Sequence, residues 1–300
     1  MLACASIAPL SPKAVQLNRA GVEALQQGDL EMAEARFALA LEFHPRFVDA
    51  LVNLGILEMQ RGSFEQARQR FKRAVSINRH VAQPHHALGL LCEREGERAN
   101  ASEYYRRALE VDPGFVPSRA NLARLLFESG ELDRAREQFL RLTQAAPDSQ
   151  LGYVGLIETL LRLGRTQEAD QLAEQAAASL PQAVELRIYL ARRELRKNNV
   201  GRAVQLLTDV AAEPGVVRVA ALGWLGLAYL VQGDSGRAEA VAQQALAMDR
   251  DNALASYVLA MALRTAGNDM ARLWLERADH LAPGDSVIRS ELMRANPISR

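Results

Sequence analysis

Apolar and polar positions along the chain recur together with a fixed period. A glycine recurs at a step of 34 residues, and a small residue follows each glycine in register. The glycines are Gly28, Gly62, Gly96, Gly130 and Gly164. The small residues are Ala33, Ala67, Ala101, Ala135, Ala169 and Ala203, followed by slightly shifted members at Ala238 and Ala271. This period predicts about eight stacked repeats, each with a first helix, a tight turn at the glycine and a second helix.

Small residues on both helices of a repeat predict that the two helices pack closely. Gly55 on a first helix faces Ala67 on the second, so two antiparallel helices can approach each other there. Large rings are expected to fill the space between repeats, at Phe37, Phe71, Tyr105 and Phe139. One helix pair cannot bury its own apolar face, so the sequence predicts an all-α solenoid in which neighbouring repeats cover each other.

The repeated residues resemble the tetratricopeptide repeat. The second repeat carries Leu51, Leu54, Gly55, Gly62, Ala67, Phe71 and Ala74 where that family places a large apolar residue, Leu, Gly, Gly, Ala, Phe and Ala. The resemblance extends over residues 14–285. It implies a right-handed superhelical solenoid whose concave face binds another protein or a peptide, without catalysis and without a cofactor.

The two ends of the chain and one turn depart from the pattern. Residues 1–13 contain prolines and a serine and are interpreted as an N-terminal tether. Residues 286–300 are interpreted as a capping helix that shields the last repeat, followed by a tail. In the sixth repeat Asn198 replaces the turn glycine, and we expect it to adopt a left-handed backbone conformation.

Helical spacing predicts which side chains of the first helices face the concave surface. Asparagines there can bond the extended backbone of a partner, and Arg, Tyr and Trp are enriched among residues that dominate binding. The predicted partner-binding residues are Asn53, Asn121, Arg124, Glu158, Arg162, Tyr189, Arg192, Arg196, Trp224, Tyr257 and Arg264. An alternative interpretation places Trp224 and Tyr257 partly in the core and leaves the arginines solvated. The main contact surface is expected between Arg162 and Tyr257.

Charge and motif content narrow the functional class. The sequence has 36 basic and 36 acidic residues, so no net field attracts the whole molecule to nucleic acid or to an anionic membrane. It contains no phosphate-binding glycine loop, nucleophile elbow or HExxH pair. These observations favour a binding scaffold over an enzyme.

A competing hypothesis is a metal-binding or enzymatic protein. It depends on a short stretch that contains His80, His85, His86 and Cys92. The spacing of these residues differs from that of a zinc finger, and His85 and Cys92 fall at expected packing positions. We therefore assign the four side chains to the structure and keep metal binding as the alternative.

The N-terminal sequence raises the question of a lipid anchor. Leu2-Ala3-Cys4 matches the end of the box that precedes the lipidated cysteine of bacterial lipoproteins, but the charged and apolar stretch that must precede it is missing. Either the start codon lies further upstream or the match is due to chance. The first alternative resembles the pilotin class, repeat-containing lipoproteins that assist type IV pilus assembly, and implies an outer-membrane lipoprotein facing the periplasm. The second implies a cytoplasmic adaptor.

Overall fold

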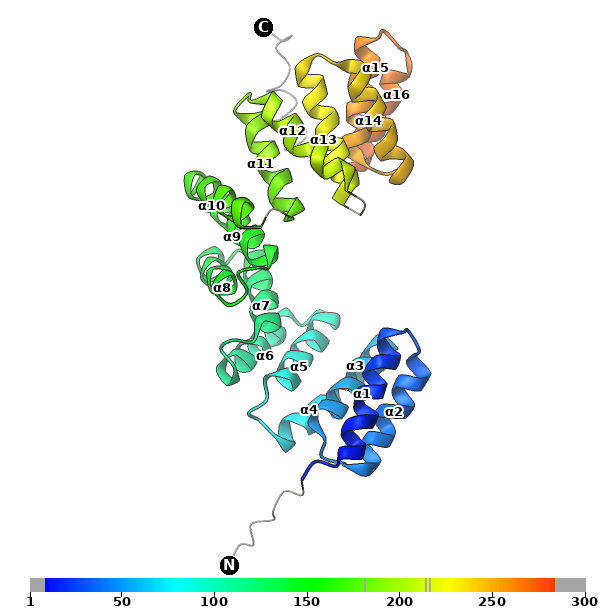
Figure 1. Cartoon of the computed structure of the whole chain (residues 1–300), viewed down its shortest axis with the longest axis vertical. Coiled ribbons are helices and arrows are strands. Elements are labelled where there is room, and N and C mark those ends of the chain that lie inside the picture. The colour runs from blue at the N-terminus through cyan, green and yellow to red at the C-terminus, as the bar shows by residue number, and fades with distance from the viewer. Residues whose placement is uncertain (1–8, 181, 214, 216, 284–300) are drawn as a thin grey trace, which may run out of the picture. The chain divides into compact units, whose positions relative to one another are not determined.

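The structure is a computed structural model that describes residues 9–180, 182–213, 215 and 217–283. Over these residues it contains sixteen α-helices and no strand (Figure 1). The chain divides into two compact halves, Met1–Pro147 and Asp148–Arg300, called here the N-terminal half and the C-terminal half. The prediction of an all-α solenoid built from about eight helix-turn-helix repeats is confirmed.

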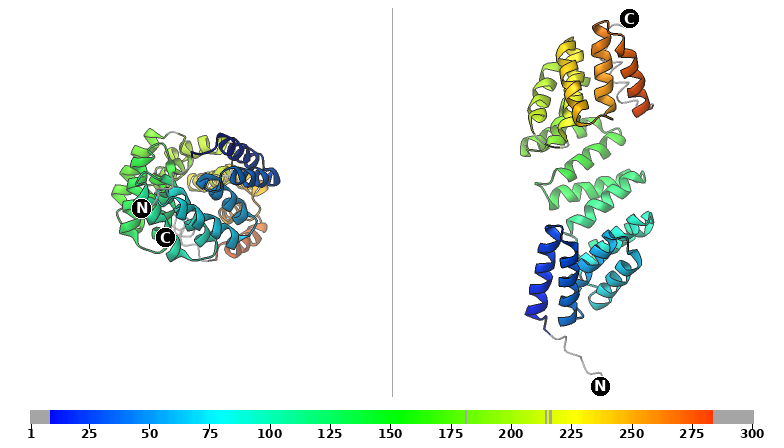
Figure 2. Two further views of the ribbon diagram at one scale, coloured as in Figure 1. Left: turned by 90° about the horizontal axis from the view of Figure 1, so that it is seen from below. Right: turned by 90° about the vertical axis from the view of Figure 1, so that its right-hand side faces the viewer.

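Each repeat consists of an odd-numbered first helix and an even-numbered second helix. In the N-terminal half these are α1 (Pro12–Gln26), α2 (Leu30–Phe43), α3 (Val48–Gln60), α4 (Phe64–Ile77), α5 (Ala82–Arg94), α6 (Arg98–Val111), α7 (Val116–Glu128) and α8 (Leu132–Ala145). In the C-terminal half they are α9 (Gln150–Arg162), α10 (Thr166–Ser179), α11 (Val184–Arg196), α12 (Val200–Ala212), α13 (Val217–Gln232), α14 (Ser235–Met248), α15 (Ala253–Thr265) and α16 (Met270–Leu281). The two helices of a repeat run antiparallel, as α1 and α2 show (Figure 2).

The turns inside the repeats require a left-handed backbone. The turn glycines have φ values from 69° to 81°, a region that side chains with a Cβ atom rarely adopt. Asn198 has a φ of 62° and replaces glycine in the sixth repeat, as expected. The second helix begins soon after each turn. In α2 and α14 its N-terminus is capped by Asp29 and Asp234, whose carboxylates accept hydrogen bonds of 2.9 Å from the backbone N–H three residues later.

In each of the first three repeats, a glycine on the first helix lies against an aromatic ring of the second helix. A Cβ added at Gly55 would lie 2.5 Å from Cε1 of Phe71, and one at Gly89 would lie 2.5 Å from Cε1 of Tyr105. Real Cβ atoms do not approach carbon this closely, so the rings occupy the space that a side chain would need. Phe71 and Tyr105 are fully buried as a result.

The boundaries of the repeat array differ slightly from the sequence-based expectation. The first helix begins at Pro12, inside the segment predicted as a tether, because proline is tolerated at the first position of a helix. The sixth repeat ends with Glu213 in an extended conformation after α12. The predicted capping helix and tail, residues 286–300, lie outside the described residues.

Candidate functional site

In the N-terminal half, the predicted asparagines bond to other side chains of the repeat array. Nδ2 of Asn53 on α3 donates a hydrogen bond of 3.0 Å to Oδ1 of Asn18 on α1. Nδ2 of Asn121 on α7 donates one of 3.2 Å to the hydroxyl of Tyr105 on α6. Both asparagines therefore connect neighbouring helices, and a partner could use only their remaining hydrogen-bonding capacity.

A polar network surrounds Asn121 and includes the predicted Arg124. The Tyr105 hydroxyl donates to Glu93, and burial together with this bond raises the pKa of Tyr105 far above its ordinary value. Arg124 donates to Glu128 at 2.8 Å and also pairs with Glu93. Arg124 is exposed and pairs with two carboxylates, so these three groups together carry one net negative charge.

In the C-terminal half, three predicted residues from successive first helices come together. The guanidinium carbon of Arg192 on α11 lies 4.5 Å from the ring centroid of Trp224 on α13, which is a cation–π geometry. Burial raises the pKa of Glu158 on α9, and the charge of Arg192 acts in the opposite direction. Glu158, Arg192 and Trp224 thus form one group across α9, α11 and α13.

Trp224 is more enclosed than its helical position suggests. Its side chain is 9% exposed and belongs to the core of the C-terminal half. Tyr257 on α15 is partly buried against the same core. For these two residues the structure agrees with the alternative interpretation of the sequence, in which the rings belong partly to the core, while Arg192 covers the outer side of the indole.

The other predicted residues lie nearby on the first helices or at their ends. The hydroxyl of Tyr189 donates a hydrogen bond of 3.0 Å to Asp170 on α10, and burial, followed by this bond, raises the pKa of Tyr189 to about 12. Arg162 and Arg196 are exposed near the C-terminal ends of α9 and α11. Arg264 is exposed and lines a shallow depression between α15 and α16.

A buried ion pair beside this group was not predicted. Arg193 and Glu194 on α11 are 4% and 2% exposed, and Nη2 of Arg193 lies 2.6 Å from Oε1 of Glu194. Burial raises the pKa of Glu194, but the hydrogen bonds from Arg193 and Asn199 outweigh it, so the pKa lies below its ordinary value. The sequence carried a signal, because the preceding repeat has Thr159 and Leu160 at the same two positions. Two adjacent charged residues at core positions that are uncharged in the preceding repeat indicate a buried pair.

The residues of the metal hypothesis have separate partners. Nδ1 of His86 lies 3.0 Å from the Ser118 hydroxyl, and Nε2 of His85 lies 3.3 Å from the carbonyl oxygen of Arg79. Nε2 of His80 accepts a hydrogen bond of 3.3 Å from Nε of Arg79, and Cys92 is buried with a raised pKa because of desolvation. Within the described ranges, no group of three or more His, Cys, Asp or Glu side chains is arranged to hold a metal ion.

Two observations concern the membrane. Cys4, the predicted lipidation site, lies outside the described residues. None of the helices described here combines the length and the apolar character needed to cross a bilayer.

Family models identify the repeats. Three models, each described as a tetratricopeptide repeat, match residues 46–113, residues 94–154, and residues 154–216 with 224–286. Together these matches span well over half of the chain, which belongs to the tetratricopeptide repeat family. The family and its fold are generally those of non-catalytic scaffolds for protein–protein interaction. A comparison with curated proteins found no match.

Several solved structures share the fold at low identity. A tetratricopeptide repeat protein from Parabacteroides merdae is 18% identical and has a TM-score of 0.57, with 84% of this chain and 100% of that chain covered. Pseudomonas aeruginosa pilF is 22% identical and has a TM-score of 0.58, with 69% of this chain and 94% of that chain covered. The APC/C hetero-tetramer Cut9-Hcn1 matches with 18% identity and a TM-score of 0.60, covering 97% of this chain and 57% of that chain. At these identities the likeness concerns the fold alone.

Proposed function

We propose that this protein is a non-catalytic scaffold that binds a protein or peptide through the exposed face of its first helices. The group formed by Glu158, Arg192 and Trp224 is the centre of the contact surface. The observation that carries this proposal is the stacking of Arg192 on Trp224 at 4.5 Å. Stacking fixes the orientation of a planar guanidinium, so less conformational entropy is lost when it donates hydrogen bonds to a partner.

The surroundings of Arg192 support the same surface. Arg162 and Arg196 are exposed on α9 and α11, and the exposed Glu158 adds a carboxylate beside Arg192. Arginine and tryptophan are also the side chains that most often dominate the energy of a protein interface. A partner that supplies carboxylates or backbone carbonyls to the arginines would fit this surface.

The test is a quantitative capture experiment from the native cells with crosslinking. We expect the double variant Arg192→Glu, Arg196→Glu to recover about tenfold less partner than the unaltered protein, a loss of about 1.4 kcal/mol. Arg134→Glu is the matched control, because Arg134 is an exposed arginine on the second helix α8. Equal recovery by the double variant and the unaltered protein would refute the proposed surface.

The non-catalytic part of the proposal has its own test. The competing metal-binding or enzymatic hypothesis requires a metal bound through His80, His85, His86 and Cys92. Elemental analysis of the purified protein is expected to show no stoichiometric zinc, iron or copper. Stoichiometric metal that disappears in His86→Gln would favour the competing hypothesis instead.

A narrower hypothesis concerns the cellular role. We propose that the scaffold acts in the bacterial envelope, in type IV pilus assembly, as a lipoprotein anchored through Cys4. The Leu2-Ala3-Cys4 stretch supports this role, whereas the likeness to pilF supports only the fold. Expression from the gene with its upstream DNA should yield a membrane-fraction protein that begins at Cys4 and carries added acyl mass. A protein beginning at Met1 or Leu2 in the soluble fraction would contradict the anchor.

A further inference from the structure

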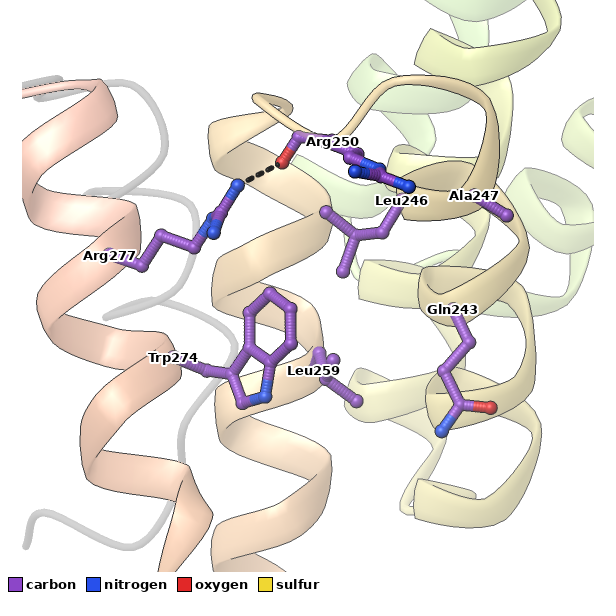
Figure 3. A pocket seen from close by; sticks show the side chains of 7 residues that line it. All are labelled: Gln243, Leu246, Ala247, Arg250, Leu259, Trp274 and Arg277. Carbon is purple, nitrogen blue, oxygen red and sulfur yellow. Dashed lines mark hydrogen bonds between the residues drawn. The ribbon is translucent and has the colours of Figure 1, made fainter.

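A groove in the C-terminal half lies apart from the proposed binding surface. It is formed mainly by the second helices α14 and α16, and its volume is about 320 Å³. The lining residues are Gln243, Leu246, Ala247, Arg250, Leu259, Trp274 and Arg277 (Figure 3). None of them belongs to the residues proposed above for partner binding, so the groove requires a separate explanation.

The floor of the groove is apolar. Leu246 from α14 and Leu259 from α15 are nearly buried, while the indole of Trp274 from α16 is partly exposed beside them. Figure 3 shows the indole of Trp274 facing the side chains of Leu246 and Leu259. An apolar side chain placed there would remove surface of all three residues from water, which is favourable.

The rim of the groove carries two arginines. Arg277 donates a hydrogen bond of 2.8 Å to the backbone carbonyl of Arg250, and its guanidinium carbon lies 5.6 Å from the ring centroid of Trp274. Asp251 accepts a hydrogen bond of 3.2 Å from the same guanidinium and offsets part of its charge. The side chain of Arg250 is exposed at the mouth, and the lining contains two arginines and no carboxylate.

We propose that this groove binds a separate peptide segment in which a large apolar side chain is adjacent to one or more carboxylates. The apolar side chain enters between Leu246 and Trp274, and the carboxylate pairs with Arg250. The groove is thus a second docking site on the second helices, for an acidic peptide of a partner protein.

Charge separates this occupant from the chain's own C-terminal segment. Residues 284–300 carry Asp285 and Glu291 together with three arginines, Arg289, Arg294 and Arg300, so their side chains sum to one positive charge. A positive segment does not complement a rim that presents two arginines. The sign of the charge therefore favours an acidic segment from another protein.

The experiment pans a phage-displayed random peptide library against the purified full chain and, in parallel, against Arg250→Glu. We expect the full chain to enrich peptides with a large apolar residue beside Asp or Glu. Synthetic versions, followed by fluorescence anisotropy, should bind Arg250→Glu at least about tenfold more weakly and should weaken as salt increases. Arg202→Glu, an exposed charge reversal on α12, is the matched control and should leave the affinity unchanged.

Two further variants distinguish the sites and the occupants. Trp274→Ala should also reduce peptide affinity while the helical circular dichroism is kept, whereas Arg192→Glu should leave it unchanged because that residue belongs to the other surface. The proposal is overturned by a lack of enrichment, by enriched peptides without acidic residues, or by equal affinity for Arg250→Glu. It is also overturned if peptides bind only after deletion of residues 284–300, or if Arg250→Glu abolishes a dimer of this chain, because the occupant is then the chain itself.

Discussion

The repeats of the N-terminal half and the fifth repeat join their two helices with opposite distributions of side-chain volume. In the N-terminal half a glycine on the first helix accommodates an aromatic ring of the second, as Gly55 does for Phe71. In the fifth repeat, at the start of the C-terminal half, the corresponding positions hold Ile157 and Ala173, both buried. The large and small partners have exchanged helices, which indicates that the combined volume of the pair matters more than the identity of either residue.

The seventh repeat shows a third arrangement. Gly226 and Ala242 are both small, and a Cβ added at Gly226 would lie 2.8 Å from Cγ1 of Val258 on the first helix of the next repeat. Val258 of the next repeat thus shares with Val241 of α14, whose Cγ2 would lie 3.1 Å from the same Cβ, the space that a ring of the same repeat fills in the N-terminal half. The seventh repeat therefore depends more on a contact with the next repeat at this position.

The largest change in stability is expected when the large and small side chains of a helix pair in the N-terminal half are exchanged. Phe71→Ala is expected to destabilise the protein by about 3–5 kcal/mol, because it leaves a cavity beside Gly55. Gly55→Ile alone should also destabilise it, by about 1–3 kcal/mol, because the new side chain would overlap the ring. The double variant recreates the arrangement of Ile157 and Ala173 and should recover at least about 1 kcal/mol relative to the sum of the two single effects.

Urea unfolding with hydrogen exchange in α3, α4 and α5 is the measurement for these variants. Purely additive effects of the two substitutions would contradict the idea that the pair is defined by its combined volume.

Acid should weaken the N-terminal half more than the C-terminal half. Burial lowers the pKa of His86 to about 4, and its ring lies 5.5 Å from Tyr105 and 5.4 Å from Phe115. Because the unfolded chain takes up this proton at a higher pH than the folded chain, the stability present above about pH 6.5 is lost as the pH falls towards about 4. The expected loss is about 3 kcal/mol.

The check compares hydrogen exchange in both halves at several pH values, with His86→Gln as the non-titrating control. His280 is the one histidine of the C-terminal half, and it is exposed. An equally steep pH dependence in His86→Gln and in the unaltered protein would assign the acid sensitivity to other groups.

The smallest effect is expected at the turn of the sixth repeat. Asn198→Gly should stabilise the protein by up to about 1 kcal/mol, because glycine adopts a φ near 62° without the steric penalty of a side chain. The adjacent Asn199 is the contrasting control, since its amide donates a hydrogen bond of 2.8 Å to Glu194 and Asn199→Gly should destabilise. Thermal unfolding of both variants gives the comparison. A loss of stability in Asn198→Gly would show that the asparagine side chain stabilises the folded protein by more than its left-handed backbone destabilises it.

The repeat architecture could be read from the sequence because its determinants are local and recur. Turn glycines such as Gly62 are needed for a left-handed turn, and small residues such as Ala67 are needed wherever two helices touch closely. Each requirement recurs at the same step, so the number of repeats and the type of each helix follow from the pattern. The same alignment places Ile157 and Ala173 at the positions of Gly55 and Phe71. Only the structure shows that the residues at these two positions contact each other.

The candidate site was predictable only in part. Helical spacing gives the direction of a side chain around its own helix, and Arg192, predicted in this way, is partly exposed in the structure. It does not give the side chains that neighbouring helices bring to that face. For this reason the burial of Trp224 and the bond between Asn121 and Tyr105 emerged only from the structure.

The sequence by itself determined an all-α array of tetratricopeptide repeats, because helix, turn and close contact depend on residues a short distance apart in the chain. The tertiary structure alone decided how enclosed polar groups are paired, as Arg193 is with Glu194, and where a groove opens between α14 and α16. Burial and surface shape depend on the packing of whole helices against one another. The period in the sequence does not encode these features, because the side chains that meet there differ from one repeat to the next.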